Sequence, residues 1–170
     1  QEIRDAFYKS TGIETQVVIS SSGKLSSQII EGAPFDIFIS ADTVYPNFLF
    51  ERGKTLGKPI IYTYGQLIVW SRNHSMEWGP GIFEMDRIAI ANPSFAPYGV
   101  AAQKVMTQLQ VYEKVANRLV FGESVAQTNQ YILSGAADFG FTARSIVHSN
   151  QMQDVGSWAE VPIALYGGIP

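Results

Sequence analysis

The sequence contains no cysteine. This absence excludes disulfide bonds, thiol nucleophiles and thiolate metal sites, although it does not identify a compartment, because many exported proteins also lack cysteine. Basic residues are scarce as well, since 12 Lys and Arg against 15 Asp and Glu give a net charge of -3. The chain has no basic stripe of the kind that neutralises a phosphate backbone, so we expect no direct nucleic-acid partner.

Long apolar runs and catalytic motifs are also missing. No stretch approaches the roughly 18 consecutive apolar residues of a membrane span, and the start has no basic segment followed by an apolar core. The motifs GxSxG, the P-loop and GxGxxG do not occur. We therefore predict no membrane span, no enzyme and no catalytic residue.

Apolar residues are nevertheless plentiful. They make up 46% of the 170 positions, which suffices for one domain or two small lobes with real cores. The first apolar helical face, through Ile3 and Phe7, has no capping residue ahead of it, and the closing "VPIALYGGIP" predicts a strand that leads onward. We interpret the chain as a fragment truncated at both ends.

Strand and helix patterns alternate along the chain. In the first part we predict strands at residues 15–20 and 35–40, with helices at residues 24–31 and after Asp42. In the second part we predict strands at residues 87–91 and 138–142, with helices at residues 98–109, 111–118 and 125–134. This alternation predicts an α/β fold with mostly parallel sheets and helices on both faces.

One apolar segment suits a crossing between two lobes. Residues 60–71 are too many for an average strand of about five or six residues, and Gly65 lies near their middle. A final strand at residues 161–166 would return the chain. We predict a first lobe of residues 1–66 plus 160–170, a second lobe of residues 67–159, and a hinge near residues 64–70 and 160–166.

Three strand-to-helix loops carry the best candidates for a site: "SSSG" at residues 20–23, "NPSFAPYG" at residues 92–99 and "GESV" at residues 122–125. Each ends at a helix N-terminus, where free backbone N–H groups bind anions without Lys or Arg. Serine and tyrosine hydroxyls add donors, while Gly23 and Gly99 let the backbone approach closely. Together these features suit a tetrahedral oxyanion held by donors rather than by a carboxylate.

Ordinary helix capping is the favoured interpretation of each of these loops when it is taken alone, because serine is a common N-cap residue and Ser22 is placed to cap. The presence of three such loops on one rim supports ligand binding as strongly as capping, so both interpretations stay open.

Other polar residues favour structural roles. His74 and His148 stand apart without metal-ligand spacing, so we expect surface histidines and no metal site. Asp36 and Asp42 favour backbone hydrogen bonding and helix capping over a catalytic pair. We expect no cofactor.

The segment from Ser20 to Asp42 resembles the periplasmic molybdate-binding proteins of ABC transporters, the ModA family. Their pattern of a serine cluster, a helix, "GAP" and "D(I/L)FISAD" is matched by "SSSGKL", "GAP" at residues 32–34 and "DIFISAD" at residues 36–42. The resemblance continues through "IAIANPSFAPYGVAAQKVM", "ESVAQTNQYILSGAADFGFTA" and "VPIALYGG", and so covers nearly the whole chain.

The resemblance implies a two-lobed type II periplasmic binding protein that captures molybdate or tungstate between its lobes and delivers it to an ABC permease. It places the protein in the periplasm, or outside the cytoplasm on a lipid anchor in a Gram-positive host. Carried over by position, Ser22 donates from its hydroxyl and its backbone N–H, and Tyr98 and Val125 donate from the second lobe. Ser21, Gly23 and Gly99 complete the loops.

Two departures from the family pattern affect the site. Some members bring a tyrosine to the ligand from the strand end at which this chain has Ala143, and Tyr98 would replace that contact. The family's first strand and the Ser/Thr-bearing helix start that follows it would precede Gln1.

Donors alone favour fully ionised molybdate or sulfate over phosphate, which keeps a proton near neutral pH and needs an acceptor; cavity size would then separate molybdate from sulfate. The main alternative function is a ligand-sensing effector domain of a bacterial transcription regulator that binds a small anion. An enzyme on the same fold, such as the deaminase of tetrapyrrole synthesis, is disfavoured because that chemistry needs a cysteine.

Overall fold

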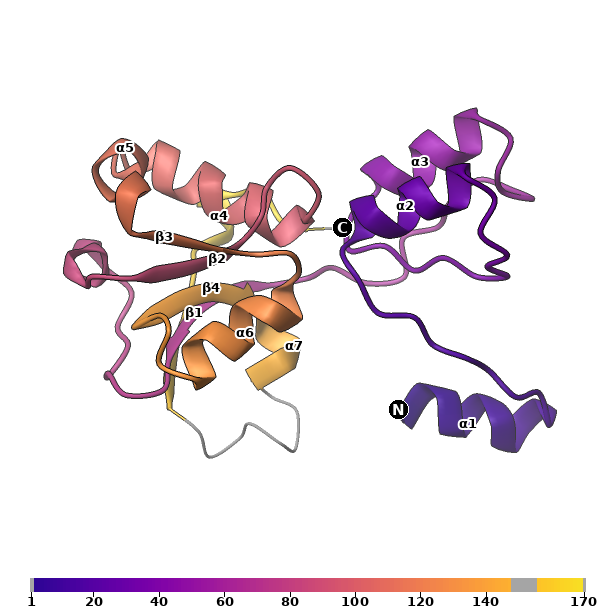
Figure 1. Cartoon of the computed structure of the whole chain (residues 1–170), viewed down its shortest axis with the longest axis horizontal. Helices are drawn as coiled ribbons and strands as arrows, with labels where there is room; N and C mark the ends of the chain where they lie inside the picture. The colour runs from indigo at the N-terminus through magenta and orange to yellow at the C-terminus, as the bar shows by residue number, and fades with distance from the viewer. Residues whose placement is uncertain (1, 148–155, 170) are drawn as a thin grey trace.

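A five-stranded sheet forms the core of the larger part of the molecule, on the left in Figure 1, in the computed structural model, which describes residues 2–147 and 156–169. The strands lie in the order β3-β2-β4-β1-β5. Their bounds are β1 Leu67–Ser71, β2 Ile88–Ala91, β3 Leu119–Gly122, β4 Phe139–Ala143 and β5 Ser157–Glu160.

The sheet is mixed rather than mostly parallel. Strand β2 pairs in parallel with β3 and β4, as expected for strands linked by helices. Strand β1 pairs antiparallel with β4 and β5. The parallel half of the sheet is therefore the half that carries the strand-to-helix loops after β2 and β3, whose carboxyl ends meet at one edge.

Helices cover both faces of this sheet, as predicted (Figure 1). Helix α4, Pro97–Gln108, packs on the face that buries Leu67 and Val69, and α6, Val125–Leu133, packs on the face that buries Ile68 and Trp70. Successive residues of a strand point to opposite faces, so the continuously apolar run of β1 supplies both cores. These two cores fix the positions at which α4 and α6 begin.

The first part of the chain has helices but no strands among its described residues. Its helices are α1 Glu2–Thr11, α2 Ser22–Ile30 and α3 Val44–Glu51. The predicted strands at residues 15–20 and 35–40 are extended segments instead, with Ile19 81% and Ile37 74% exposed. A strand needs a neighbouring strand to satisfy its backbone groups, and none lies beside these segments. The prediction of two strands here is wrong for this structure.

The crossing segments also differ in detail from their prediction. The apolar run of residues 60–71 forms a strand only from Leu67 onward, and Gly65 makes an isolated antiparallel bridge with Ile169. The predicted return strand at residues 161–166 is instead a 3-10 turn, η3 Ile163–Leu165, preceded by Pro162. Proline cannot donate to a strand ladder, which accounts for the change. The lobe boundaries stay predictions.

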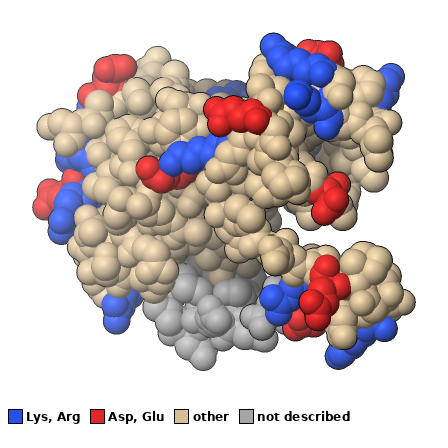
Figure 2. Space-filling view, turned by 45° about the vertical axis from the view of Figure 1, so that its right-hand side comes forward, with Lys and Arg blue, Asp and Glu red and all other residues tan. Residues whose placement is uncertain are grey.

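Short elements complete the chain: η1 Pro80–Glu84, α5 Tyr112–Val115, η2 Ala116–Arg118 and α7 Arg144–Val147. Charged side chains are scattered over the face drawn in Figure 2, and no basic stripe crosses it. In the part of the chain that the structure describes, no helix is long and apolar enough to span a bilayer.

Candidate functional site

The three loops singled out from the sequence converge in the structure. The Gly23 amide at the start of α2 donates to the Phe95 carbonyl in the loop before α4, at 3.0 Å. The Lys24 ammonium, also on α2, lies 2.6 Å from a Glu123 carboxylate oxygen in the loop before α6. The N-termini of α2, α4 and α6 are therefore held around one place, although they come from distant parts of the sequence.

Neither serine at the start of α2 caps the helix through its side chain. Ser21 occupies the N-cap position and makes no side-chain capping bond, and its hydroxyl is buried without a partner among the described residues. Ser22 is the first helical residue and is 7% exposed. Its Oγ accepts from the Ala41 amide at 3.1 Å. A hydroxyl that accepts one bond still has a proton to donate, so Ser22 keeps a donor with a fixed oxygen position.

Position 23 requires glycine because the start of α2 lies very close to the loop before α4. A Cβ at this position would lie 2.8 Å from Phe95 Cβ, 2.8 Å from the Tyr45 hydroxyl and 3.0 Å from Phe95 Cα. Such distances are too short for carbon, so any side chain at position 23 would push α2 away from the loop before α4. The absence of a side chain lets the two loops touch.

The second loop starts α4 with Pro97 in its first turn, a position where the missing proline N–H costs nothing. A Cβ on Gly99 would overlap the Ala91 carbonyl oxygen at the end of β2. The Gly99 amide donates to Ala96 O at 2.9 Å. Gly99 thus sets helix-to-strand packing, and its amide is engaged within its own loop.

Tyr98 follows Pro97 and borders a cavity of about 460 Å³ between the two parts of the chain. The cavity is also lined by Ser40 and Ala41 from the first part and by Ser145 from the second. Burial, with smaller effects of the neighbouring Tyr166 and Tyr62, raises the pKa of Tyr98 to about 12. Its hydroxyl therefore stays protonated at neutral pH and remains a donor.

The third loop behaves as an ordinary cap. Ser124 is the N-cap of α6, and its Oγ accepts from the Gln127 amide at 3.3 Å. Val125 is the first residue of the helix, where a backbone N–H has no acceptor within the helix. Capping is thus the role of Ser124, whereas Ser21 and Ser22 do not cap.

Two charged groups at the site were not foreseen. Glu123 belongs to the third loop and is an acceptor that the expectation of donors alone overlooks, but its carboxylate is paired with Lys24. Arg144 borders the cavity directly after Ala143, and its Nη1 donates to Gln66 Oε1 at 2.7 Å and to Glu160 Oε1 at 2.8 Å. Only the three-dimensional pairing of these side chains reveals their role.

The remaining sequence candidates lie away from this place or have local partners. His74 is exposed, and His148 falls outside the described residues. Asp42 accepts from the Tyr45 amide at 3.4 Å, one residue ahead of the N-cap Thr43 of α3. Across residues 2–147 and 156–169, no group of three His, Cys, Asp or Glu side chains could hold a metal ion.

The arrangement favours a small anion over a cation or a reacting substrate. The Ser22 hydroxyl and the starts of α2 and α6 are donors, and the carboxylate at the rim is neutralised by Lys24. The Tyr98 hydroxyl lies beside Gly65, in a cavity whose lining does not include Ser22 or Val125. Donors of this kind bind an oxyanion without a counter-charge.

Known proteins resemble this chain along its entire length. Residues 1–170 match the family model of bacterial extracellular solute-binding proteins. The molybdate-binding protein ModA of Azotobacter vinelandii is 35% identical over 171 residues, which cover 98% of this chain and 68% of that protein. ModA of Rhodobacter capsulatus is 36% identical over 170 residues, which cover 98% of this chain and 66% of that protein.

The solved structure of the periplasmic molybdate-binding protein of Azotobacter vinelandii has a TM-score of 0.91 to this chain at 33% identity, and the match covers 99% of this chain and 76% of that one. The predicted type II periplasmic binding protein fold is confirmed by this match. The chain spans about two thirds of the length of the two curated relatives. It belongs to the family of bacterial extracellular solute-binding proteins.

Proposed function

We propose that this protein binds molybdate or tungstate in the cleft between its two lobes and delivers the anion to an ABC permease. The donors are the Ser22 hydroxyl and amide, the Tyr98 loop and the Val125 amide, while Ser21, Gly23 and Gly99 shape the loops. No metal, cofactor or catalytic residue is part of the proposal, because molybdenum arrives only as the bound oxyanion.

The observation that carries the proposal is the hydrogen bonding of Ser22. Its Oγ accepts a hydrogen bond from the Ala41 amide at 3.1 Å and does not cap α2. The proton of this hydroxyl has no acceptor among the described residues, and it lies where the starts of three helices meet. A buried donor without an acceptor is costly, and an oxyanion would satisfy it.

The charge state of the ligand follows from the same donors. Molybdate, tungstate and sulfate are fully ionised near neutral pH, whereas phosphate keeps a proton that needs an acceptor. Lys24 pairs with one oxygen of the Glu123 carboxylate and neutralises its charge, so this group does not repel a bound dianion. We therefore propose a preference for doubly charged, unprotonated oxyanions, with cavity size separating molybdate and tungstate from sulfate.

Family membership supports transport over the alternative of a regulatory effector domain. The matched family consists of extracellular solute-binding proteins, and two curated relatives are named molybdate-binding proteins. We propose that this protein works outside the cytoplasm and that its partner is a membrane permease rather than DNA.

Thermal unfolding tests the proposal. At a concentration a hundred times its dissociation constant, a ligand adds about 2.7 kcal/mol to the free energy of unfolding. For a chain of this size that raises the unfolding midpoint by roughly 5 to 10 °C. We expect this rise with molybdate and tungstate and none with phosphate. An unchanged midpoint with molybdate and tungstate would refute the proposal.

A further inference from the structure

We propose that Lys24, Glu123 and Phe95 form a latch that holds the two lobes closed over the anion. The latch deepens the proposed function and rests on it for its effect on affinity, but its effect on the distance between the lobes is independent of any ligand. None of the three side chains needs to touch the anion, so each is a positioning residue.

The geometry joins the two lobes at the site itself. Lys24 stands two residues after Ser22 on α2, and Glu123 stands two residues before Val125, which starts α6. Their charged groups are 2.6 Å apart, although the residues belong to different lobes and are far apart in sequence. The pair can form only when the starts of α2 and α6 face each other.

Phe95 adds two further contacts to the same closure. Its carbonyl accepts from the Gly23 amide at 3.0 Å. Its ring lies 5.6 Å from the Lys24 ammonium, within the range of a cation–π interaction. Lys24 therefore contacts both loops of the second lobe that meet α2, and opening of the cleft would break all of these contacts together.

The position of this ion pair distinguishes it from ion pairs within one part of the chain. Arg4 and Asp5 are neighbours on α1. Arg144 directly follows β4 and Glu160 ends β5, so both lie on the one sheet and their pairing does not join α2 to the second part of the chain. Lys24 and Glu123 are 36% and 67% exposed, so their attraction is partly screened by water. Such a pair adds little to folding stability. Because it forms only when the lobes are closed, its full free energy favours the closed state over the open state.

The pairing also sets the charge at the rim. With Lys24 in place, the negative charge of the Glu123 carboxylate is neutralised beside the start of α6. Without Lys24, that negative charge would stand near the bound dianion and oppose it. The latch is therefore expected to act on oxyanion affinity through closure and through the charge at the rim.

Charge reversal with rescue tests the latch. We would measure molybdate affinity for the wild type, Lys24→Glu, Glu123→Lys and the double reversal. Removal of an exposed pair is expected to weaken binding about two- to fivefold, with charge reversal at the upper end and the double variant returning towards the wild type. Lys114→Gln, on the exposed side of α5, is the control for loss of a lysine charge. The differences should shrink at about 1 M salt.

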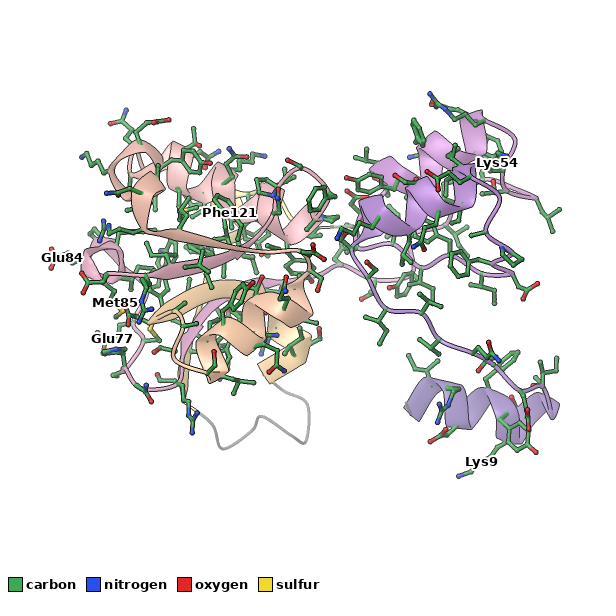
Figure 3. All side chains as sticks on the ribbon, in the orientation of Figure 1. Lys9, Lys54, Glu77, Glu84, Met85 and Phe121 are labelled. Carbon is green, nitrogen blue, oxygen red and sulfur yellow. The ribbon has the colours of Figure 1, made fainter. Side chains whose placement is uncertain are left out.

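A distance measurement provides a readout without ligand. The chain has no cysteine, so spin labels on Lys54→Cys and Glu84→Cys would attach only at those positions, which lie in opposite parts of the molecule (Figure 3). We expect Lys24→Glu to shift the label distance towards longer values and the double reversal to reverse the shift.

The outcomes separate the two proposals. If the wild type takes up no molybdate but the distances shift and recover as expected, the proposed function fails and the latch stands. If the wild type binds molybdate while Lys24→Glu matches Lys114→Gln in both affinity and distance, the latch is overturned and the proposed function stands.

Discussion

At the scale of single residues, adjacent or similar side chains serve different purposes in this site. Ser124 caps α6 with its hydroxyl, whereas Ser22 starts α2 and turns its hydroxyl to the Ala41 amide. Gly99 is needed for packing against β2, and Gly23 for contact between the lobes. The same residue types therefore separate into structural and binding roles only through their partners.

Replacement of Ser22 tests its role as a donor. Ser22→Ala should weaken molybdate binding by about 1 to 3 kcal/mol, because a charge-assisted hydrogen bond is lost. Titration calorimetry measures the change. Ser27→Ala is the matched control, since Ser27 lies on the same helix and donates to the Gly23 carbonyl from an exposed position. Equal affinities of Ser22→Ala and the wild type would leave Ser22 as a purely structural residue.

The raised pKa of Tyr98 leads us to predict that the stability of the fold depends on pH. Its pKa is raised to about 12, chiefly by burial, so the folded state holds the phenolic proton more tightly than the unfolded state with its ordinary pKa of about 10. The resulting stabilisation is complete below about pH 10 and is lost as the pH rises towards 12. Urea unfolding at several pH values should show a steeper loss for the wild type than for Tyr98→Phe. Parallel curves would contradict the burial of this hydroxyl.

At the scale of elements, the second lobe was largely predictable from the sequence. Helices α4 and α6 and strands β2 and β4 lie within a few residues of their predicted bounds, because caps, glycine stops and apolar periods agree there. No strand was predicted at the positions of β3 and β5, and β5, "SWAE", alternates between half-buried and exposed positions. Residues 15–20 and 35–40 have strand composition but no neighbour to pair with, and composition does not supply a partner.

Part of the candidate site was also predictable from the sequence, and part of it was not. The loops with Ser22, Tyr98 and Val125 could be located because local signals mark each helix start. Their convergence and the pairing of Lys24 with Glu123 depend on contacts between distant segments, which a single sequence does not reveal.

The junction between β2 and α4 gives a prediction about stability. Gly99→Ala should lower the free energy of unfolding by about 1 to 3 kcal/mol, because the added methyl group meets backbone atoms of Ala91 and Asn92 that have little room to move. Denaturant unfolding measures the loss. Gly57→Ala is the control, since nothing lies within 4 Å of its Cβ position. A Gly99→Ala protein as stable as this control would refute the tight contact.

At the scale of the whole molecule, the two parts of the chain meet at the proposed site. The Gly23–Phe95 hydrogen bond and the Lys24–Glu123 ion pair join the parts near the starts of α2, α4 and α6. Binding and closure are therefore expected to be coupled, because an anion in this place contacts both parts only when they are together.

A side chain at position 23 should weaken molybdate binding while leaving the stability of the fold nearly unchanged. Gly23→Ala places a methyl group 2.8 Å from Phe95 Cβ, which opposes closure by about 1 to 3 kcal/mol, so molybdate affinity should fall about 5- to 150-fold. Small-angle X-ray scattering should show that molybdate compacts the wild type more than the variant, while the unfolding midpoints without ligand stay close. Full compaction of Gly23→Ala would show that closure does not require the glycine.

The measurement that tests the oxyanion cleft most directly is calorimetric titration of the protein with molybdate, tungstate, sulfate and phosphate in turn, each repeated on Ser22→Ala. We predict saturable binding of one molybdate or tungstate per chain, weaker or absent sulfate binding, no phosphate binding, and a loss of molybdate affinity in the variant. Binding of phosphate as tight as molybdate, or no binding of any of the four anions, would contradict a cleft built from hydrogen-bond donors for an unprotonated oxyanion.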